Sequence, residues 1–184
     1  MNVEMINPEY PVWSITDMEL TQLDYRRGES KGYPGRYHLD IVSPVDGINQ
    51  FVSEWCKQYT DIIRIAKSDN TELWGQIWKH YADNISISER VEFTADEPGF
   101  TMGPHTDNRW IVAVLIINLV DNPGGSTNFP HLDWQASDAE GDGVFFLNHI
   151  NTAHSIDWQG TTDRWIAYHT ITIEDIYENI NTGR

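Results

Sequence analysis

The sequence predicts an α+β domain in which helices back a sheet or a rolled β-sandwich. Apolar residues in the first 84 positions recur mainly at the helical spacing of three and four, whereas those from Ile85 onward alternate with polar residues, as in half-buried strands. Helices followed by a run of strands are typical of α+β domains. At 184 residues the chain fits one domain, with strand and helix support in residues 1–84 and a β core in residues 85–175.

An amphipathic helix is predicted from Ser43 to Ala66. Ser43 is expected to cap its first turn and Pro44 to occupy the first helical position. Cys56 falls on the predicted apolar face and is therefore expected in the core. A second, shorter helical pattern runs from Leu73 to Tyr81. The apolar positions of the first pattern are Ile48, Phe51, Val52, Trp55, Cys56, Tyr59, Ile62, Ile63 and Ala66.

Four later segments are predicted as strands. Residues 85–95 alternate apolar and polar side chains, and the nearly continuous β-branched and aliphatic run Trp110 to Leu119 indicates a strand buried on both faces. The sequence Asp121-Asn-Pro-Gly-Gly then forces a turn. Gly143 to Asn148 and Arg164 to Ile173 complete the set.

The composition limits the classes of partner. Twelve Lys and Arg residues against 28 Asp and Glu residues give a net charge of -16, which repels phosphate backbones and anionic membrane surfaces. Nucleic acid is therefore an unlikely partner, and the acidity favours solubility over attraction of basic substrates. Because Cys56 is the only cysteine, the chain can form no internal disulfide and no cysteine-based zinc site. Without an apolar span or a signal segment, we expect a cytoplasmic protein.

His105-Thr-Asp107 places two metal-ligand side chains two residues apart, which on a strand directs both to one face. One further histidine would complete a face of two histidines and one carboxylate. Such a face binds Fe(II) and leaves three positions open for an oxidant and a co-substrate. A lone pair of this kind is frequent by chance, so its context must decide.

The third ligand must come from His131, His149, His154 or His169, and the context favours His154. It follows the apolar segment Val144-Phe-Phe-Leu, and Arg164 follows it by ten residues at the head of the last predicted strand. A dicarboxylic co-substrate that chelates iron at one end needs a guanidinium for its distal carboxylate, and Arg164 can supply one. The other three histidines are expected to be non-ligands.

These segments resemble the Fe(II)/2-oxoglutarate-dependent dioxygenases, especially their prolyl-hydroxylase-like branch, over residues 91–173. The resemblance rests on Glu97-Pro-Gly-Phe-Thr-Met-Gly-Pro-His-Thr-Asp, Leu115-Ile-Ile-Asn-Leu, Gly124-Gly-Ser-Thr-Asn-Phe, Gly141-Asp-Gly-Val-Phe-Phe with His154-Ser-Ile, and Asp163-Arg-Trp. It implies a double-stranded β-helix, the cupin-like jelly roll, with iron at one mouth. It also implies that 2-oxoglutarate and O2 are consumed, succinate and CO2 are released, and the substrate is hydroxylated, since Asp107 is retained.

The chain departs from the family at two places. Asp96-Glu97 stands where many relatives carry a tyrosine before the Pro-Gly turn, and Leu115 stands where a tyrosine often binds the co-substrate. Tyr168 lies four residues after Arg164 on the same predicted strand face. It is therefore the candidate replacement for a second 2-oxoglutarate contact.

The glycine-rich stretch from Tyr25 to His38 is the one locally basic segment, and one hypothesis is that it forms a lid over the substrate entrance. Its arginines 26, 27 and 36 could meet an anionic group, and Tyr33 or Tyr37 could stack on a flat one. A surface loop whose arginines pair with the acidic body is the alternative. Residues 108–110 (Asn, Arg, Trp) are also expected near the opening.

Two other functions fit parts of the pattern. A catalytically silent jelly-roll module would keep the fold without turnover, although all three ligands and Arg164 are present. A zinc hydrolase could use the same ligands, but it would lack an evident general base and leave Arg164 unexplained. The substrate, a small molecule or a peptide, is not identified by the sequence.

Overall fold

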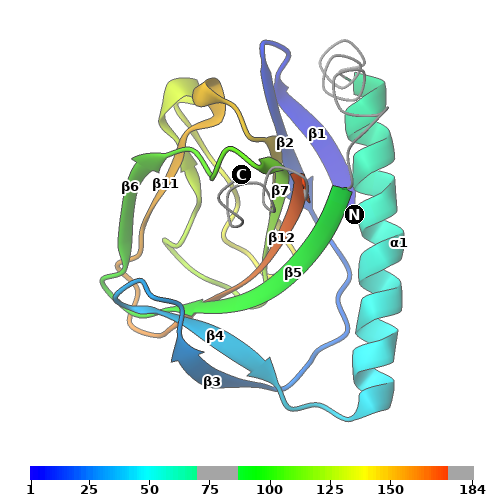
Figure 1. The fold of residues 1–184 in the computed structure, drawn as a ribbon, viewed down its shortest axis with the longest axis vertical. Coiled ribbons are helices and arrows are strands. Elements are labelled where there is room, and N and C mark those ends of the chain that lie inside the picture. Colours follow the sequence, from blue (N-terminus) through cyan, green and yellow to red (C-terminus); the bar gives the residue numbers. More distant parts are fainter. Residues whose placement is uncertain (70–86, 174–184) are drawn as a thin grey trace, which may run out of the picture.

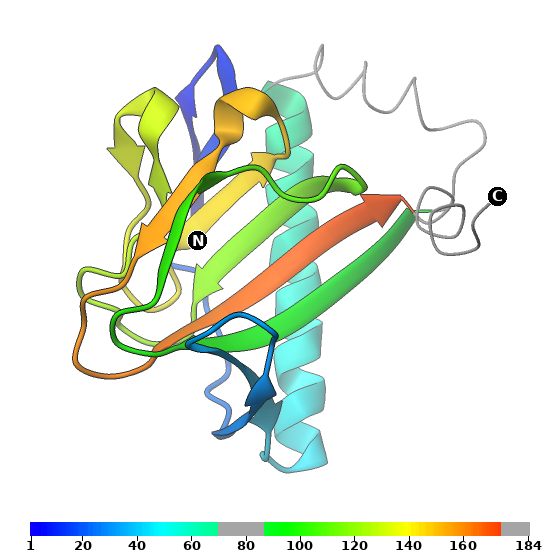
Figure 2. The same ribbon diagram turned by 60° about the vertical axis from the view of Figure 1, so that its left-hand side comes forward.

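Two antiparallel β-sheets face each other, and one long helix covers the outer face of the larger sheet (Figures 1 and 2). The computed structural model describes residues 1–69 and 87–173. The larger sheet has the order β1 (Asn2–Asn7), β2 (Tyr10–Thr16), β10 (Gly143–Leu147), β7 (Ile111–Asn118), β12 (Arg164–Ile173), β5 (Ile87–Asp96), β4 (Arg36–Ile41) and β3 (Tyr25–Ser30). The smaller has the order β6 (Thr101–His105), β11 (His154–Asp157), β8 (Asn128–Phe129) and β9 (Trp134–Gln135).

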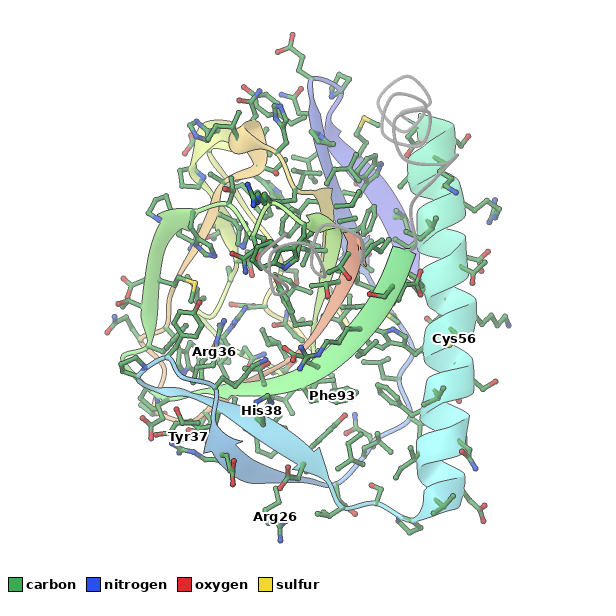
Figure 3. All side chains as sticks on the ribbon, viewed as in Figure 1. Arg26, Arg36, Tyr37, His38, Cys56 and Phe93 are labelled. Atoms are coloured by element: carbon green, nitrogen blue, oxygen red, sulfur yellow. The ribbon has the colours of Figure 1, made fainter. Side chains whose placement is uncertain are left out.

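Helix α1 (Val45–Asp69) confirms the first predicted helix, but it begins at Val45 rather than at Pro44, and its buried face is narrower than predicted. The hydroxyl of Ser43 accepts a hydrogen bond from the backbone N–H of Asp24, and the carbonyl of Pro44 accepts from Ile48 N–H. The buried stripe is narrower than predicted, so Cys56 is exposed and the prediction of a core cysteine is wrong (Figure 3). The stripe consists of Phe51, Trp55, Tyr59, Ile62 and Ala66.

Strand β7 separates two hydrophobic cores, as its continuous apolar run predicts. Leu115 and Ile117 face α1, whereas Val114 and Ile116 face the smaller sheet. Side chains of successive strand residues point to opposite faces, so a strand that is buried on both faces is apolar at nearly every position. The core between the sheets holds one wall of the site in place.

The N-terminal segment contributes strands to both ends of the larger sheet. Strand β2 pairs with β10, and the glycine-rich stretch forms the hairpin β3–β4, which pairs with β5. The predicted lid is therefore a sheet-bound hairpin with a short turn. The second predicted helix, residues 73–81, lies outside the described residues. None of the helices in the described ranges is long and apolar enough to cross a membrane.

His169 on β12 connects the sheet to α1. Its Nδ1 accepts a hydrogen bond of 3.2 Å from Trp55 Nε1, and its ring lies 4.0 Å from the ring of Tyr59. Its Nε2 is buried and has no hydrogen-bond partner among the described residues. Burial lowers the pKa of His169 to about 4, so the imidazole is neutral at neutral pH. This histidine belongs to the core under the helix.

The free energy of unfolding should fall between pH 7 and pH 5 partly because of His169. The unfolded chain takes up the proton near the ordinary pKa of 6.5, whereas the folded chain resists it until about pH 4. The folded state therefore loses about 2 kcal/mol at pH 5 through this group. Urea unfolding of His169→Leu at both pH values should show a smaller loss than wild type. His131→Leu, at an exposed histidine, is the control. An unchanged loss in His169→Leu would contradict the assignment.

Candidate metal centre

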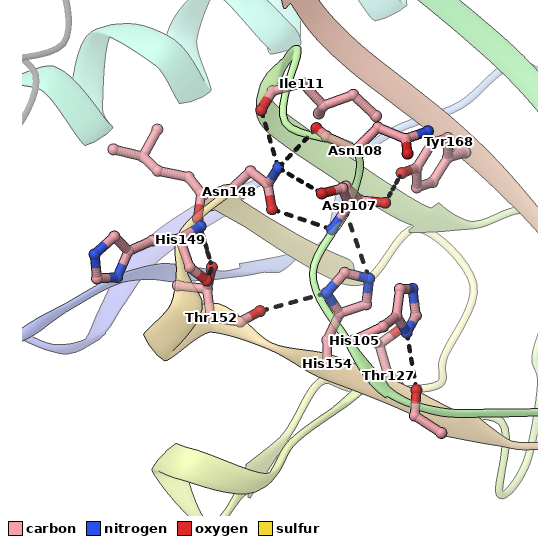
Figure 4. Close-up of polar contacts among 12 residues, drawn as sticks. His105, Asp107, Asn108, Ile111, Thr127, Asn148, His149, Thr152, His154 and Tyr168 are labelled. Atoms are coloured by element: carbon pink, nitrogen blue, oxygen red, sulfur yellow. Dashed lines mark hydrogen bonds and ion pairs between the residues drawn. The ribbon is translucent and has the colours of Figure 1, made fainter.

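His105, Asp107 and His154 meet in a cavity of about 830 Å³ between the two sheets (Figure 4). One ligand atom from each residue lies within 4.8 Å of the others. Among residues 1–69 and 87–173, this is the one group of three histidines or carboxylates so arranged. The structure thus brings together the three side chains that the sequence singles out.

The backbone pairing of β6 and β11 positions the two histidines. His105 is the last residue of β6 and stands directly opposite His154, the first residue of β11. Asp107 lies beyond the end of β6, so the loop rather than strand alternation directs its side chain. Asn148 holds this loop. Its Oδ1 accepts from the N–H of Asp107 at 3.1 Å, and its Nδ2 donates to the carbonyls of Asp107, Asn108 and Ile111.

The hydrogen bonds of the three side chains leave one donor atom of each available to a cation. His105 Nδ1 lies 2.9 Å from the carbonyl of Gly103, and His154 Nδ1 lies 3.3 Å from that of Thr152. With a proton on each Nδ1, both Nε2 atoms are lone-pair donors. Asp107 Oδ2 is buried without a hydrogen-bond partner among the described residues, 3.8 Å from His154 Nε2. This buried, unpartnered oxygen beside two imidazoles fits a divalent metal ion.

Burial and neighbouring charges set the protonation of the site. Burial lowers the pKa of His154, and the proximity of His105 acts in the same direction, although the charge of Asp107 opposes both. The neutral imidazole, which is the metal-binding form, is therefore favoured. Burial and the charge of Asp107 raise the pKa of Tyr168 well above its ordinary value. Tyr168 thus keeps its proton and donates a 2.7 Å hydrogen bond to Asp107 Oδ1.

Arg164 lies at another part of the cavity wall, with only 2 % of its surface exposed. Its Nε donates to the carbonyl of Gly125 at 2.7 Å, Nη1 to Asp96 Oδ2 at 3.0 Å, and Nη2 to Thr127 Oγ1 at 3.2 Å. Its charged partner is thus the buried Asp96 rather than Asp163, which precedes it in sequence. The guanidinium has five N–H groups, so two remain for a ligand in the cavity.

Contacts with Arg164 and His154 account for the residue types in the Gly-Gly-Ser-Thr-Asn-Phe loop. A Cβ on Gly125 would lie 3.0 Å from Cδ of Arg164, so a larger residue would crowd the arginine. Thr127 accepts from Arg164, and the ring of Phe129 lies 5.9 Å from that of His154. The loop therefore supports both ends of the site.

Arg36, which the sequence placed only in the entrance segment, and Asp96, for which the sequence predicted no role in binding, both join the inner site. Arg36 contacts Asp96 through Nε at 2.6 Å and Nη2 at 2.8 Å, so two guanidiniums share one fully buried carboxylate. Figure 3 shows Arg36 directed toward the space between the sheets and Arg26 directed away from it. The strand register places Asp96 opposite both Arg36 and Arg164. Residue spacing along the sequence does not reveal this cross-strand pairing.

The other predicted site residues separate into two groups. Tyr33, Asn108 and Trp110 line the cavity, as expected of residues near an entrance. Arg26 pairs with Asp40, and Arg27 contacts Glu97 and Asp163, outside that cavity. Leu115, at the family's tyrosine position, faces α1 and does not reach the cavity.

The three other candidate histidines lie away from the metal-ligand cluster. His131 and His149 are exposed, and His149 accepts a hydrogen bond from the N–H of Asn151. His169 is buried in the core beneath α1. That these three do not bind metal stays a prediction.

Comparison with solved structures identifies the fold. A Pseudomonas putida prolyl-4-hydroxylase matches with a TM-score of 0.54 and 12 % identity over 89 % of this chain and 92 % of that one. The viral collagen prolyl hydroxylase from Paramecium Bursaria Chlorella virus-1, in its 2OG complex, matches with a TM-score of 0.50 and 15 % identity over 82 % and 79 %. No protein-family model and no curated protein matches the sequence. The chain thus has the prolyl-hydroxylase-like double-stranded β-helix that the resemblance implies.

Divalent metal should bind through the three clustered side chains. We expect His105→Ala, Asp107→Ala and His154→Ala each to abolish Mn(II) binding in a calorimetric titration, because each removes one of only three protein ligands. The free energy of unfolding should change little in His105→Ala and Asp107→Ala, since neither residue is in the core. His149→Ala is the matched control and should bind like wild type. Retained binding without His154, together with loss without His149, would contradict this ligand set.

Tyr168→Phe should weaken Mn(II) binding by about tenfold or more, because removal of a hydrogen bond that orients a ligand typically costs tenfold to a hundredfold in metal affinity. The substitution removes only the hydroxyl that fixes Asp107 Oδ1. Tyr33→Phe, at a cavity-lining tyrosine that is 56 % exposed, is the control for loss of a phenol. Equal Mn(II) affinities in all three proteins would exclude an orienting role.

Proposed function

We propose that this chain is an Fe(II)- and 2-oxoglutarate-dependent dioxygenase that uses O2 to hydroxylate a substrate and releases succinate and CO2. One observation carries the proposal. Within residues 1–69 and 87–173, a buried oxygen of Asp107 without a hydrogen-bond partner faces His154 in the same cavity as a buried arginine with unused N–H groups. A metal site and a carboxylate site in one cavity are what an iron-chelating dicarboxylate requires.

His105, Asp107 and His154 would hold Fe(II) and leave three coordination positions for 2-oxoglutarate and O2. The bound iron supplies the oxidative chemistry, in which 2-oxoglutarate, O2 and a C–H bond yield succinate, CO2 and an alcohol. Tyr168 keeps Asp107 oriented through the hydrogen bond to Oδ1. Because its only proton is used there, Tyr168 has no second donor for the co-substrate, and its predicted direct contact stays a prediction.

Arg164 would bind the distal carboxylate of 2-oxoglutarate. The group formed by Arg36, Asp96 and Arg164 has two positive charges and one negative charge, so one positive charge is left over. A buried charge without a counter-ion is unfavourable, and a ligand carboxylate would neutralise it. Asp96 and Thr127 fix the guanidinium before the ligand arrives.

Water should be kept from the reacting groups by the apolar wall between the sheets. Ile116, Ile156 and Ile166 line the cavity, and Phe146 packs on the His154 ring at 4.7 Å. Such surroundings strengthen the electrostatic interactions within the site.

Purified protein with Fe(II) should release succinate from 2-oxoglutarate in air, alone or with a substrate panel, and Arg164→Ala should lose this activity. The same variant should bind 2-oxoglutarate at least about thirtyfold more weakly, because truncating one partner of a buried charge pair costs roughly 2–5 kcal/mol. Mn(II) affinity should be unchanged, as Arg164 makes no contact with the three ligands.

Arg164→Lys provides a gentler variant that keeps the charge but loses the fork, and it should fall between wild type and Arg164→Ala. Arg26→Ala, which breaks an exposed ion pair outside the cavity, is the control. Wild-type affinity for 2-oxoglutarate in both Arg164 variants would sink the assignment and favour a silent module.

A further inference from the structure

Positive side chains are concentrated in the cavity of an otherwise acidic protein. Among the described residues, four of the chain's 12 Lys and Arg residues line it, against two of its 28 Asp and Glu residues. Arg36 and Arg164 belong to the inner group that holds Asp96. The other two, Lys31 and Arg90, are not used by the proposed reaction.

Lys31 and Arg90 form a second group of the same kind around Glu92. Lys31 Nζ contacts one carboxylate oxygen of Glu92, and Arg90 Nη2 contacts the other. The side chains of Lys31 and Glu92 are 14 % and 17 % exposed, and that of Arg90 is 70 % exposed. Two cations again share one carboxylate, so one positive charge is left over at the cavity wall.

The two groups are separate places along the same strand. Glu92 and Asp96 both lie on β5, four residues apart, which is about 13 Å in an extended strand. Alternation directs both to the same face of β5. A molecule of 2-oxoglutarate held between the metal and Arg164 would therefore leave Lys31 and Arg90 accessible from the cavity.

We propose that Lys31 and Arg90 form an outer anion subsite that binds a carboxylate or phosphate group of the substrate. The substrate is then an anionic small molecule or an acidic peptide segment, a conclusion that rests on the proposed dioxygenase function. Lys31 belongs to the turn of the β3–β4 hairpin, so the predicted entrance segment contributes to recognition through this lysine.

Glu92 orients the two cations and limits their strength. Burial alone would raise the pKa of Glu92, but its hydrogen bond to Lys31 and the charges of Lys31 and Arg90 bring it below the ordinary value. The carboxylate therefore stays charged near neutral pH and competes with any incoming anion. A net charge of -16 repels anions at long range. Binding of an anion at Lys31 and Arg90 therefore depends on these local contacts, and its affinity should fall as salt increases.

Calorimetric titration with small probes tests the subsite in protein saturated with Mn(II) and 2-oxoglutarate. The probes are phenyl phosphate, benzoate and the uncharged benzamide. We expect at least one anion to bind and benzamide to bind at least about tenfold more weakly, because two charge-assisted hydrogen bonds are lost. The stronger of the two anions indicates whether the substrate group is a phosphate or a carboxylate.

Substitutions with opposite expected effects locate the binding. Lys31→Gln combined with Arg90→Gln should weaken the anion by about tenfold or more, whereas Glu92→Gln should tighten it severalfold by releasing both cations. Arg64→Gln and Asp61→Asn are matched controls, since Arg64 is also 70 % exposed and pairs with one carboxylate, on α1 away from the cavity. Unchanged affinity for 2-oxoglutarate in each variant reports an intact inner site.

Equal binding of benzamide and the anions, or unchanged anion affinity in the double variant, would overturn the subsite. Weaker anion binding in Glu92→Gln would do the same. If the protein fails to bind 2-oxoglutarate but still binds an anion through Lys31 and Arg90, the dioxygenase proposal fails and the subsite stands.

Discussion

The buried carboxylate of Asp96 is the constraint on which the arrangement of the cavity depends. It is fully buried, and an ionised group in that position is tolerated only when it is paired and hydrogen-bonded. Arg164 lies on the neighbouring strand β12 and Arg36 on the other neighbour, β4, so satisfying one charge connects three strands. The hairpin that carries Arg36 is thereby attached to the wall of the cavity. Loss of the carboxylate would leave two guanidiniums facing each other.

The candidate metal ligands are held by a different kind of restraint, made of backbone pairing and amide hydrogen bonds. The smaller sheet places His105 opposite His154, and Asn148 ties the loop that carries Asp107 to the end of β10. The two parts of the site therefore come from opposite sheets, and the apolar core between the sheets sets their separation. The length of a ligand that reaches from the candidate metal centre to Arg164 would therefore have to match the distance between the two sheets.

Much of this arrangement could be predicted from the sequence, because local patterns carry it. The apolar period defined α1, and the last predicted strand, Arg164–Ile173, has the bounds of β12. The width of a helix stripe is less well encoded, since neighbouring elements decide which apolar positions are covered, and Cys56 is left exposed. The role of Asp96 could not be predicted, because it depends on strand register rather than on spacing. Glycines in residues 25–38 indicated a loop, whereas pairing with β5 gave a hairpin.

The three protein contacts of Arg164 have a consequence for the affinity and selectivity of ligand binding. A free arginine side chain has about 2 kcal/mol of rotamer entropy, and here that freedom is already lost in the folded protein. A ligand therefore meets a preorganised fork and need not immobilise it on arrival. A rigid fork also tolerates little variation in the length of its ligand. In the proposed reaction, a diacid one methylene shorter or longer than 2-oxoglutarate would lose contact with either the candidate metal centre or the guanidinium.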